Sequence, residues 1–375
     1  MSILITGATG FLGCRILREL LTREGDDTVY VLGRGDGQQL RKRTEAAVTW
    51  LDAPPLPPGA LERLRFLSGD ITVPGLALSA EDRARAVDGL TELWHSAALL
   101  HLRGDPAPLH TANVLGTRQV LQLALEAPAA HVFHVSTAYV AGRRTIGHVR
   151  EDDLSEEYGF QTSYDESKYT AERLVHAWAE RHDRRATILR PSLLMTDRAI
   201  PPGLPAQPLD ALLRLLDDGA TRSRSVTRYL TSARLRGEAL HIRVQADAAG
   251  EGNVLQAEYA AKAMVRAADS PDVPAGVRTL HVTHPHNVSA DAAATALEAR
   301  YAGISVQLVS EVTDPTPLEA LIASQGETAL AFSAHRRTYD RTQLLRAVGD
   351  LPDPEPIDAA YLARAFGATK APLPV

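Results

Sequence analysis

Short apolar segments alternate with helical segments along the first half of this 375-residue chain, and this alternation restricts the fold more than any other feature. Strands are expected at residues 2–6, 28–32, 65–68, 91–95, 131–136 and 186–190. Helices are expected between them, at residues 11–24, 38–51, 80–88, 109–126 and 165–182. Parallel neighbours in a sheet need a long crossover connection, which is usually a helix. The pattern therefore predicts an α/β chain with a doubly wound parallel sheet and helices on both faces.

The regular alternation ends after Arg190, and the following segment is rich in proline. A helix at 256–268 and a strand at 279–282 have the character of the first-half elements and are expected to return to the sheet. The other elements expected are a helix near 209–217, a strand at 240–244 and a helix that Ser289 caps and that ends near 301. We therefore expect two units: a sheet domain at 1–190 plus about 253–284, and a smaller, discontinuous α+β substrate-binding cap at about 191–252 plus 285–375.

Composition and charge argue against several classes of function. The formal net charge is -6, which does not favour general binding to nucleic acid. No apolar run approaches the ~20 residues that span a bilayer, and residues 1–3 lack the features of a signal peptide. Cys14 is the sole cysteine, so an intramolecular disulfide is excluded and a reducing, cytoplasmic compartment is predicted. We expect neither a nucleic-acid partner nor a membrane partner.

The segment 6–13, Thr-Gly-Ala-Thr-Gly-Phe-Leu-Gly, lies directly between the first expected strand and the first expected helix. Glycines three apart allow a tight turn and a close approach of the backbone to a pyrophosphate, and the helix N-terminus offers free N–H groups. Such spacing also occurs in ordinary turns, but its place in the alternation favours a dinucleotide site on a Rossmann-type sheet. The residues expected to bind the cofactor here are Gly7, Thr9, Gly10, Phe11, Leu12 and Gly13.

The end of the second expected strand selects the cofactor. An arginine there accommodates a 2′-phosphate, whereas a carboxylate binds a ribose 2′-hydroxyl. The chain has Arg34 at this point and Arg43 in the following helix, so NADPH is predicted in preference to NADH. In the alternative, Arg34 is a solvated loop residue and Asp36 binds the ribose. After the third strand, Asp70 is expected near the adenine, with Ile71 beside it in the cofactor site.

A tyrosine and a lysine four residues apart, Tyr164 and Lys168, share one face of an expected helix. The Lys168 ammonium is expected to favour the phenolate and to lower the pKa of Tyr164 from about 10 towards neutral, which makes Tyr164 a usable general acid. Thr137 follows the fifth expected strand and is expected to donate a hydrogen bond to a reacting carbonyl oxygen. These three residues are the predicted catalytic group; the alternative is a packing tyrosine and a surface lysine.

As a set, these motifs resemble the extended short-chain dehydrogenase/reductase family. The resemblance rests on the glycine motif, Asp70, Thr137, Tyr164, Lys168, His-Ser-Ala-Ala at 95–98, Asn-Val-Leu-Gly-Thr at 113–117 and Arg-Pro at 190–191. It implies a Thr/Tyr/Lys catalytic trio and a cofactor that lies along the strand ends. It adds these residues to the predicted cofactor site: Ser96, Ala97, Ala98, Asn113, Tyr164, Lys168 and Pro191.

The segment 69–79 resembles one found in thioester reductases, a group that includes terminal reductase domains of nonribosomal peptide synthetases, carboxylic acid reductases and fatty acyl ("male sterility") reductases. The resemblance implies NADPH-dependent reduction of an acyl thioester, held by a carrier protein or coenzyme A, to an aldehyde or alcohol. Because the first strand begins at the initiator methionine, the chain is expected to act alone, in trans. Residues 192–252 depart from the group's pattern, and weak similarity continues at Tyr339 and Asp340.

Two other functions are alternatives. A ketone, aldehyde or sugar-nucleotide oxidoreductase or epimerase needs the same trio. A cofactor-sensing protein keeps the fold without turnover, but such proteins commonly lack the tyrosine–lysine pair that this chain has. Residues 222–243 form a basic stretch that contains several arginines and a single acidic residue, Glu238. This stretch either docks an acidic carrier or a coenzyme A phosphate, or is a solvated arginine face.

The histidines at 281, 284 and 286 cross from a strand into a proline turn with no neighbouring carboxylate or cysteine, so no metal site is predicted.

Overall fold

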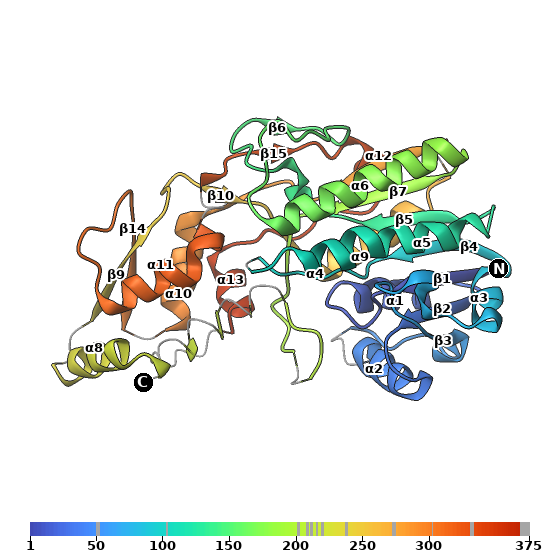
Figure 1. Cartoon of the computed structure of the whole chain (residues 1–375). Helices are drawn as coiled ribbons and strands as arrows, with labels where there is room; N and C mark the ends of the chain where they lie inside the picture. The colour runs from blue at the N-terminus through green and yellow to red at the C-terminus, as the bar shows by residue number, and fades with distance from the viewer. Residues whose placement is uncertain are drawn as a thin grey trace.

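A seven-stranded parallel sheet forms the centre of the computed structural model (Figure 1). The structure describes residues 1–49, 53–102, 104–200, 203–207, 210, 213–214, 217–218, 221–236, 239–271, 275–301, 303–330 and 334–367. Within them, the strands lie in the order β12 (Val277–Val282), β7 (Ala186–Pro191), β5 (His131–Val135), β4 (Leu90–His95), β1 (Ser2–Thr6), β2 (Thr28–Gly33) and β3 (Leu64–Ser68). Each neighbouring pair is parallel, which confirms the predicted doubly wound α/β sheet.

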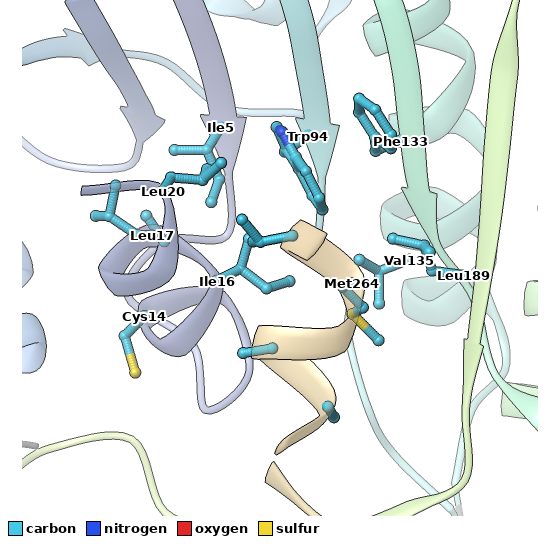
Figure 2. Close-up of a cluster of buried hydrophobic side chains, with 14 of the residues drawn as sticks. Ile5, Cys14, Ile16, Leu17, Leu20, Trp94, Phe133, Val135, Leu189 and Met264 are labelled. Atoms are coloured by element: carbon cyan, nitrogen blue, oxygen red, sulfur yellow. The ribbon is translucent and has the colours of Figure 1, made fainter. Parts of the chain in front are cut away.

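Helices cover both faces of this sheet because successive strand residues point to opposite sides. In β1, Ile3 and Ile5 lie in one buried core, whereas Leu4 lies in the other. Figure 2 shows the first core, where Trp94 and Phe133 of the strands lie near side chains of α1 and Met264 of α9. The helices on that face are α1 (Gly13–Thr22), α2 (Gly37–Thr49), α9 (Ala257–Ala268) and α12 (Thr342–Val348). The opposite core is closed by α3 (Ala80–Val87), α5 (Gly116–Leu125) and α6 (Ser163–His182).

The helix expected at 109–126 is divided into three parts. A short α4 (Ala107–Leu109) leads into a π-helical turn at His110–Leu115, which continues as α5. A π-turn inserts one extra residue into the helical ladder, and such turns occur frequently at functional sites. This turn carries Asn113, whose side chain is buried. The periodicity of apolar residues predicts a helix here but does not show the extra residue.

A second lobe follows β7 and lies on the left in Figure 1. It contains the parallel pair β9 (Leu240–Gln245) and β14 (Ile304–Val309), with α8 (Arg224–Leu235) and α11 (Pro317–Leu330) packed against it. A further core joins α10 (Ala290–Arg300) and α13 (Ala359–Ala365) to the parallel pair β8 (Leu193–Met195) and β11 (Val254–Gln256). The expected strand at 240–244 and the Ser289 cap are present, since Ser289 Oγ accepts from Ala292 N at 3.2 Å. The helix expected near 209–217 lies largely outside the described residues.

The C-terminal part of the chain contributes to both lobes. Leu344 and Val348 of α12 are buried in the sheet core, although they come from the segment assigned to the cap by sequence. The division into a sheet domain and a cap, with the boundaries given above, stays a prediction. Two short strand pairs complete the fold: β6 (His148–Val149) pairs with β15 (Thr338–Tyr339) of the C-terminal segment, and β10 (Glu251–Gly252) pairs with β13 (Val288–Ser289). Among the described helices, none combines the length and apolar character needed to cross a bilayer.

Candidate active site

The glycine turn between β1 and α1 has a shape that side chains would prevent. Gly7 has φ +78°, and a Cβ there would lie 2.5 Å from the amide nitrogen of Ala97. A Cβ on Gly13 would lie 2.0 Å from the carbonyl oxygen of Gly7. At Gly10 the closest atom to a Cβ is the same oxygen, at 3.2 Å, so its other sides are open. The turn therefore exposes the backbone of residues 7–10 to a crevice and leads directly into α1, an arrangement typical of pyrophosphate sites.

A crevice of about 760 Å³ lies at the C-terminal ends of the central strands. It brings together most of the residues predicted to bind the cofactor, namely Gly7, Thr9, Gly10, Arg34, Arg43, Asp70, Ile71, Ser96, Ala97 and Ala98. The loop after β4 adds Leu99 and Asp105, and the segment that enters the π-turn adds Thr111 and Ala112. The sequence analysis did not include these four; their position after a central strand is the signal that could have indicated them.

Positive charge lies at the end of the crevice formed by β2. Arg43 donates from Nη2 to Thr9 Oγ1 at 3.1 Å and from Nη1 to the carbonyl oxygen of Arg34 at 3.3 Å. Asp36 does not line the crevice; its Oδ1 accepts from Gln39 N at 2.8 Å at the start of α2. The crevice therefore presents arginine, and not this carboxylate, where a 2′-phosphate or 2′-hydroxyl is distinguished.

Asn113 connects the crevice to α6, although its own side chain does not line the crevice. Its Oδ1 accepts from Leu99 N at 2.7 Å, and its Nδ2 donates to Leu99 O at 3.0 Å. The same Nδ2 donates to Ser167 Oγ at 2.9 Å, and Ser167 Oγ donates to the carbonyl oxygen of Tyr164 at 2.7 Å. The loop that borders the crevice is thus fixed to the helix turn that carries the predicted proton donor. The other predicted site residues outside the crevice lining are Phe11, Leu12, Gly13, Thr137, Tyr164, Lys168 and Pro191.

The predicted catalytic residues come from two neighbouring elements. Thr137 follows β5 and caps the short helix η4 (Ala138–Ala141); its Oγ1 accepts from Tyr139 N at 3.2 Å and donates to Pro191 O at 3.5 Å. Tyr164 lies in the first turn of α6 and Lys168 in the second. Lys168 Nζ donates to the carbonyl oxygen of Val135 at 2.6 Å. This hydrogen bond places α6 in direct contact with the end of β5.

The expected effect of Lys168 on Tyr164 was wrong for this arrangement. Burial raises the pKa of Tyr164 above its usual value, and the neighbouring Asp165 carboxylate raises it further. Burial also lowers the pKa of Lys168 to about 8, although Glu172 opposes this change. Among the described residues, the recorded contact of the ammonium is with Val135, and none joins it to the phenol. The phenol is therefore protonated at neutral pH.

A buried ion pair holds α6 against the sheet. Glu172 accepts from Arg190 Nη2 at 2.7 Å and from Arg190 Nε at 3.0 Å, and both side chains are almost fully buried. Ser136 Oγ donates to the same carboxylate. Arg190 also donates from Nη1 to Asp153 O at 2.9 Å. Loss of one member of such a pair leaves an uncompensated buried charge, so the pair fixes β5, β7 and α6 relative to one another.

A neutral histidine links the glycine turn to the π-turn. Thr117 Oγ1 donates to the carbonyl oxygen of Asn113 at 2.6 Å, so it accepts from His95 Nε2, 3.1 Å away. His95 Nδ1 then accepts from Thr6 Oγ1 at 2.8 Å, and Thr6 Oγ1 accepts from Ala97 N at 3.3 Å. Burial lowers the pKa of His95 to about 3, which keeps the ring neutral. His95 therefore has an orienting role in this network.

Residues 5–263 match a family of NAD-binding domains described as "Male sterility protein". The chain belongs to this family. The family model describes an NAD-binding domain, which agrees with the doubly wound sheet and the glycine turn.

Relatives of this male sterility family member include parts of much larger enzymes. It is 32% identical over 219 residues to the large subunit of L-2-aminoadipate reductase of Penicillium chrysogenum, covering 52% of this chain and 15% of that protein. It is 36% identical over 145 residues to fatty acyl-CoA reductase 1 of Homo sapiens, covering 37% of this chain and 28% of that protein. The chain therefore spans less than a third of either relative. A solved terminal R domain from the myxalamid PKS-NRPS biosynthetic pathway matches with a TM-score of 0.74 and 25% identity, covering 100% of this chain and 92% of that one.

The histidines near the end of β12 contact backbone groups. His281 Nδ1 donates to Asp340 O at 2.9 Å, and His284 Nε2 lies 3.1 Å from Glu355 O. Within the part of the chain that the structure describes, no group of three or more His, Cys, Asp or Glu side chains is placed to hold a metal ion.

The basic stretch at 222–243 is less positive than its sequence indicates. Arg222 pairs with Asp218 at 3.1 Å, and Arg243 pairs with the buried Glu319 at 2.8 Å. These acids come from outside the stretch, which is why sequence counting missed them; Glu238 lies outside the described residues. On α8, Arg224 and Arg228 are exposed and form no ion pair with any described residue. The remaining arginines of the stretch are Arg234 and Arg236.

Proposed function

We propose that this chain is an NADPH-dependent reductase of acyl thioesters, and that it forms an aldehyde or, after a second reduction, an alcohol. The observation that carries the substrate class is the whole-chain similarity to a terminal R domain of a PKS-NRPS pathway. The relatives add support, since one is named as a fatty acyl-CoA reductase and another as an aminoadipate reductase. The acyl group is thus proposed to arrive on a carrier protein or on coenzyme A.

The crevice supports NADPH as the cofactor. Gly7 and Gly10 give the backbone room to approach a pyrophosphate, and the turn leads into the N-terminus of α1, which favours an anion. Arg34 and Arg43 supply the positive charge that a 2′-phosphate needs, whereas Asp36 is used as a cap for α2. When bound, the dinucleotide supplies the hydride that reduces the thioester carbonyl carbon.

The catalytic side chains are proposed to act on the carbonyl oxygen. Tyr164 donates a hydrogen bond to this oxygen, and Thr137 does so once its hydroxyl exchanges its 3.5 Å bond with Pro191 O for the substrate; such donors stabilise the negative charge that develops there. Because its pKa is raised, Tyr164 holds the proton that the oxygen takes. The resulting hemithioacetal breaks its C–S bond, which releases a thiol and the aldehyde. Lys168 is charged below about pH 8 and is proposed to bind the cofactor ribose.

A thioester panel tests this function directly. The protein is incubated with NADPH and with acyl-CoA and acyl-carrier thioesters, while NADPH absorbance and free thiol are measured together. We expect NADPH oxidation to be accompanied by a stoichiometric release of thiol. NADPH oxidation without thiol release rejects thioester reduction, and tightly bound NAD with turnover of a sugar nucleotide supports the epimerase alternative. A carrier protein supplied as a separate chain tests action in trans.

The exposed face of α8 is proposed to dock an acidic carrier protein. Arg224 and Arg228 lie one turn apart on this face, and opposite charge across an interface raises the association rate. Charge reversal, Arg224→Glu with Arg228→Glu, is expected to raise KM for a carrier-bound substrate about tenfold at low salt. KM for the same acyl group on a short thiol is expected to stay unchanged. Arg85→Glu on α3 is the control, and an unchanged KM for the carrier substrate contradicts docking at α8.

A further inference from the structure

The C-terminal part of the chain returns to the side of the sheet that carries the catalytic residues. There, β15 pairs in parallel with β6, which lies about 190 residues earlier (Figure 1). Backbone bonds extend this pairing on both sides: Arg336 N donates to Thr145 O at 2.7 Å, and Asp340 N donates to Val149 O at 2.8 Å. The segment is therefore firmly attached beside the loop that follows Thr137.

Within this segment, the Arg337 side chain is 2% exposed and makes several contacts. Its Nη1 donates to the carbonyl oxygens of Gly142 at 2.7 Å and Arg144 at 2.8 Å. Its Nε donates to Tyr339 Oη at 2.7 Å. The guanidinium carbon lies 5.7 Å from the ring centroid of Tyr139 and 5.6 Å from that of Tyr339. One buried cation thus holds both the backbone and a side chain of the 137–144 loop.

The same loop is fixed on its other side by Gly159. Gly142 has φ +60°, and a Cβ there would lie 2.0 Å from the carbonyl oxygen of Gly159. Arg143 N donates to that oxygen at 3.1 Å, and Gly142 N donates to Tyr139 O at 2.9 Å. The loop is therefore held between Gly159 and Arg337. Because it begins at Thr137, which caps η4, its position determines where the threonine hydroxyl lies.

The start of α6 is fixed by its own cap. Burial raises the pKa of Asp165 to about 6, whereas its hydrogen bonds with Thr162 and, to a smaller extent, the charge of Arg337 oppose this change. Asp165 Oδ2 accepts from Thr162 N at 3.1 Å, and Thr162 Oγ1 accepts from Asp165 N at 3.2 Å, which completes a capping box. The cap therefore fixes the turn that carries Tyr164, whereas the contacts of Arg337 fix the loop that begins at Thr137.

We propose that Arg337 is a positioning residue, which holds the 137–144 loop so that the Thr137 hydroxyl lies where it can act on the same carbonyl oxygen as Tyr164. This role rests on the proposed function, because it presumes that these side chains are the catalytic donors. The geometry requires an arginine: a planar guanidinium reaches the two carbonyls and the phenol together, whereas a lysine ammonium is a single point donor. No residue of the 137–144 loop lines the cofactor crevice, so the role is separate from cofactor binding.

The test compares two adjacent arginines. Arg336 is about half exposed, and its side chain pairs with Asp247, so Arg336→Ala is a matched control for Arg337→Ala. We expect Arg337→Ala to lower kcat about 10- to 100-fold, because a displacement of about 1 Å in a catalytic group has an effect of that size.

The Kd for NADPH, measured by fluorescence titration, is expected to stay within about twofold of the wild-type value in both Arg337→Ala and Arg336→Ala. Arg337→Lys is expected to recover little of the loss. A kcat within twofold of wild type in Arg337→Ala overturns the proposal, as does an equal loss in Arg336→Ala.

Hydrogen exchange gives a second readout that needs no substrate. Backbone amides of residues 138–144 are expected to exchange faster in Arg337→Ala than in Arg336→Ala, whereas the amides of α1 and the glycine turn stay unchanged. Equal exchange of the 138–144 segment in both variants overturns the proposed clamp. If the wild-type protein reduces no thioester, the proposed function fails, and the exchange result still decides whether Arg337 holds the loop.

A milder variant covers the case in which Arg337→Ala does not fold. Tyr339→Phe removes only the oxygen that accepts from Arg337 Nε and keeps the aromatic ring. It is expected to lower kcat about two- to tenfold, with an unchanged Kd for NADPH. A wild-type kcat in this variant contradicts the proposal, because the guanidinium would then need no fixed orientation.

Discussion

The two halves of the candidate site are built in different ways. The cofactor crevice depends on backbone shape: the turn at 6–13 and the ends of adjacent strands form most of its surface. The catalytic half depends on the buried side chains of Thr137, Lys168 and Arg337 and on the half-buried Tyr164, which come from three separate segments of the chain. The first half is determined by a short continuous motif, whereas the second exists only when the sheet, α6 and the C-terminal segment are assembled.

Because the two halves are built differently, substitutions in each half are expected to change different measured properties. In the crevice, removing a side chain leaves the backbone cradle in place, so such changes mainly alter affinity. In the catalytic half, the Glu172–Arg190 pair and the Asn113–Ser167 bond transmit position between elements. A variant of Thr137, Tyr164 or Arg337 is expected to change turnover while cofactor binding persists; Lys168, which is proposed to bind the cofactor ribose, is the exception. The following variants separate the two halves, beginning with the largest effect.

Replacement of the proposed proton donor is expected to have the largest effect. Tyr164→Phe removes the hydroxyl and keeps the ring, and loss of a general acid lowers rates by about 10²- to 10⁴-fold. We expect kcat for thioester reduction to fall in this range while the Kd for NADPH stays within about twofold. Tyr158→Phe, at an exposed tyrosine in the preceding loop, is the control. Full cellular function of Tyr164→Phe would instead support the cofactor-sensing alternative.

Substitution of the arginines in the crevice tests the proposed preference for NADPH. Arg34→Ala and Arg43→Ala each remove a proposed partner of the 2′-phosphate, so each is expected to raise the Kd for NADPH about 10- to 100-fold. The Kd for NADH is expected to change little, because NADH has no such phosphate. Arg41→Ala is the control on the same helix, since Arg41 lies by Phe66 and pairs weakly with Glu45. Equal losses for both cofactors contradict the NADPH assignment, and a selective loss of NADH binding in Asp36→Ala supports the carboxylate alternative.

The sequence predicted the sheet and the crevice well because both follow from local chemistry. Apolar alternation locates the strands to within about one residue, and the glycine spacing predicts the turn that Gly7 adopts. The π-turn around Asn113 was missed, because one extra residue in a helix leaves the apolar pattern nearly unchanged. Positions of charged side chains were less predictable: Asp218 and Glu319 neutralise arginines from outside the basic stretch.

The catalytic half shows the limit of sequence reasoning more clearly. The spacing of Tyr164 and Lys168 correctly places both on one helix, yet it says nothing of burial or of the carbonyl at Val135. The pKa of a buried phenol depends on desolvation, which is a property of the assembled interior. Arg337 was not predicted for the same reason, since its partners lie almost 200 residues earlier in the chain.

The smallest expected effect concerns pH and again separates the two halves. Lys168 has a pKa lowered to about 8 by burial, so it is charged below this pH and loses its proton as the pH rises through it. If its charge helps to bind the cofactor, the affinity for NADPH measured by titration falls about tenfold for each pH unit above 8, which gives a break in the pH profile near pH 8.

Two variants assign this break. Tyr164 has a raised pKa, so Tyr164→Phe is expected to keep the same break near pH 8. Lys168→Met is expected to bind NADPH weakly at every pH and to lose the break. A break that persists in Lys168→Met would assign it to another group and remove Lys168 from the cofactor site, whereas a break that disappears in Tyr164→Phe would show that the phenol and the ammonium titrate as a coupled pair.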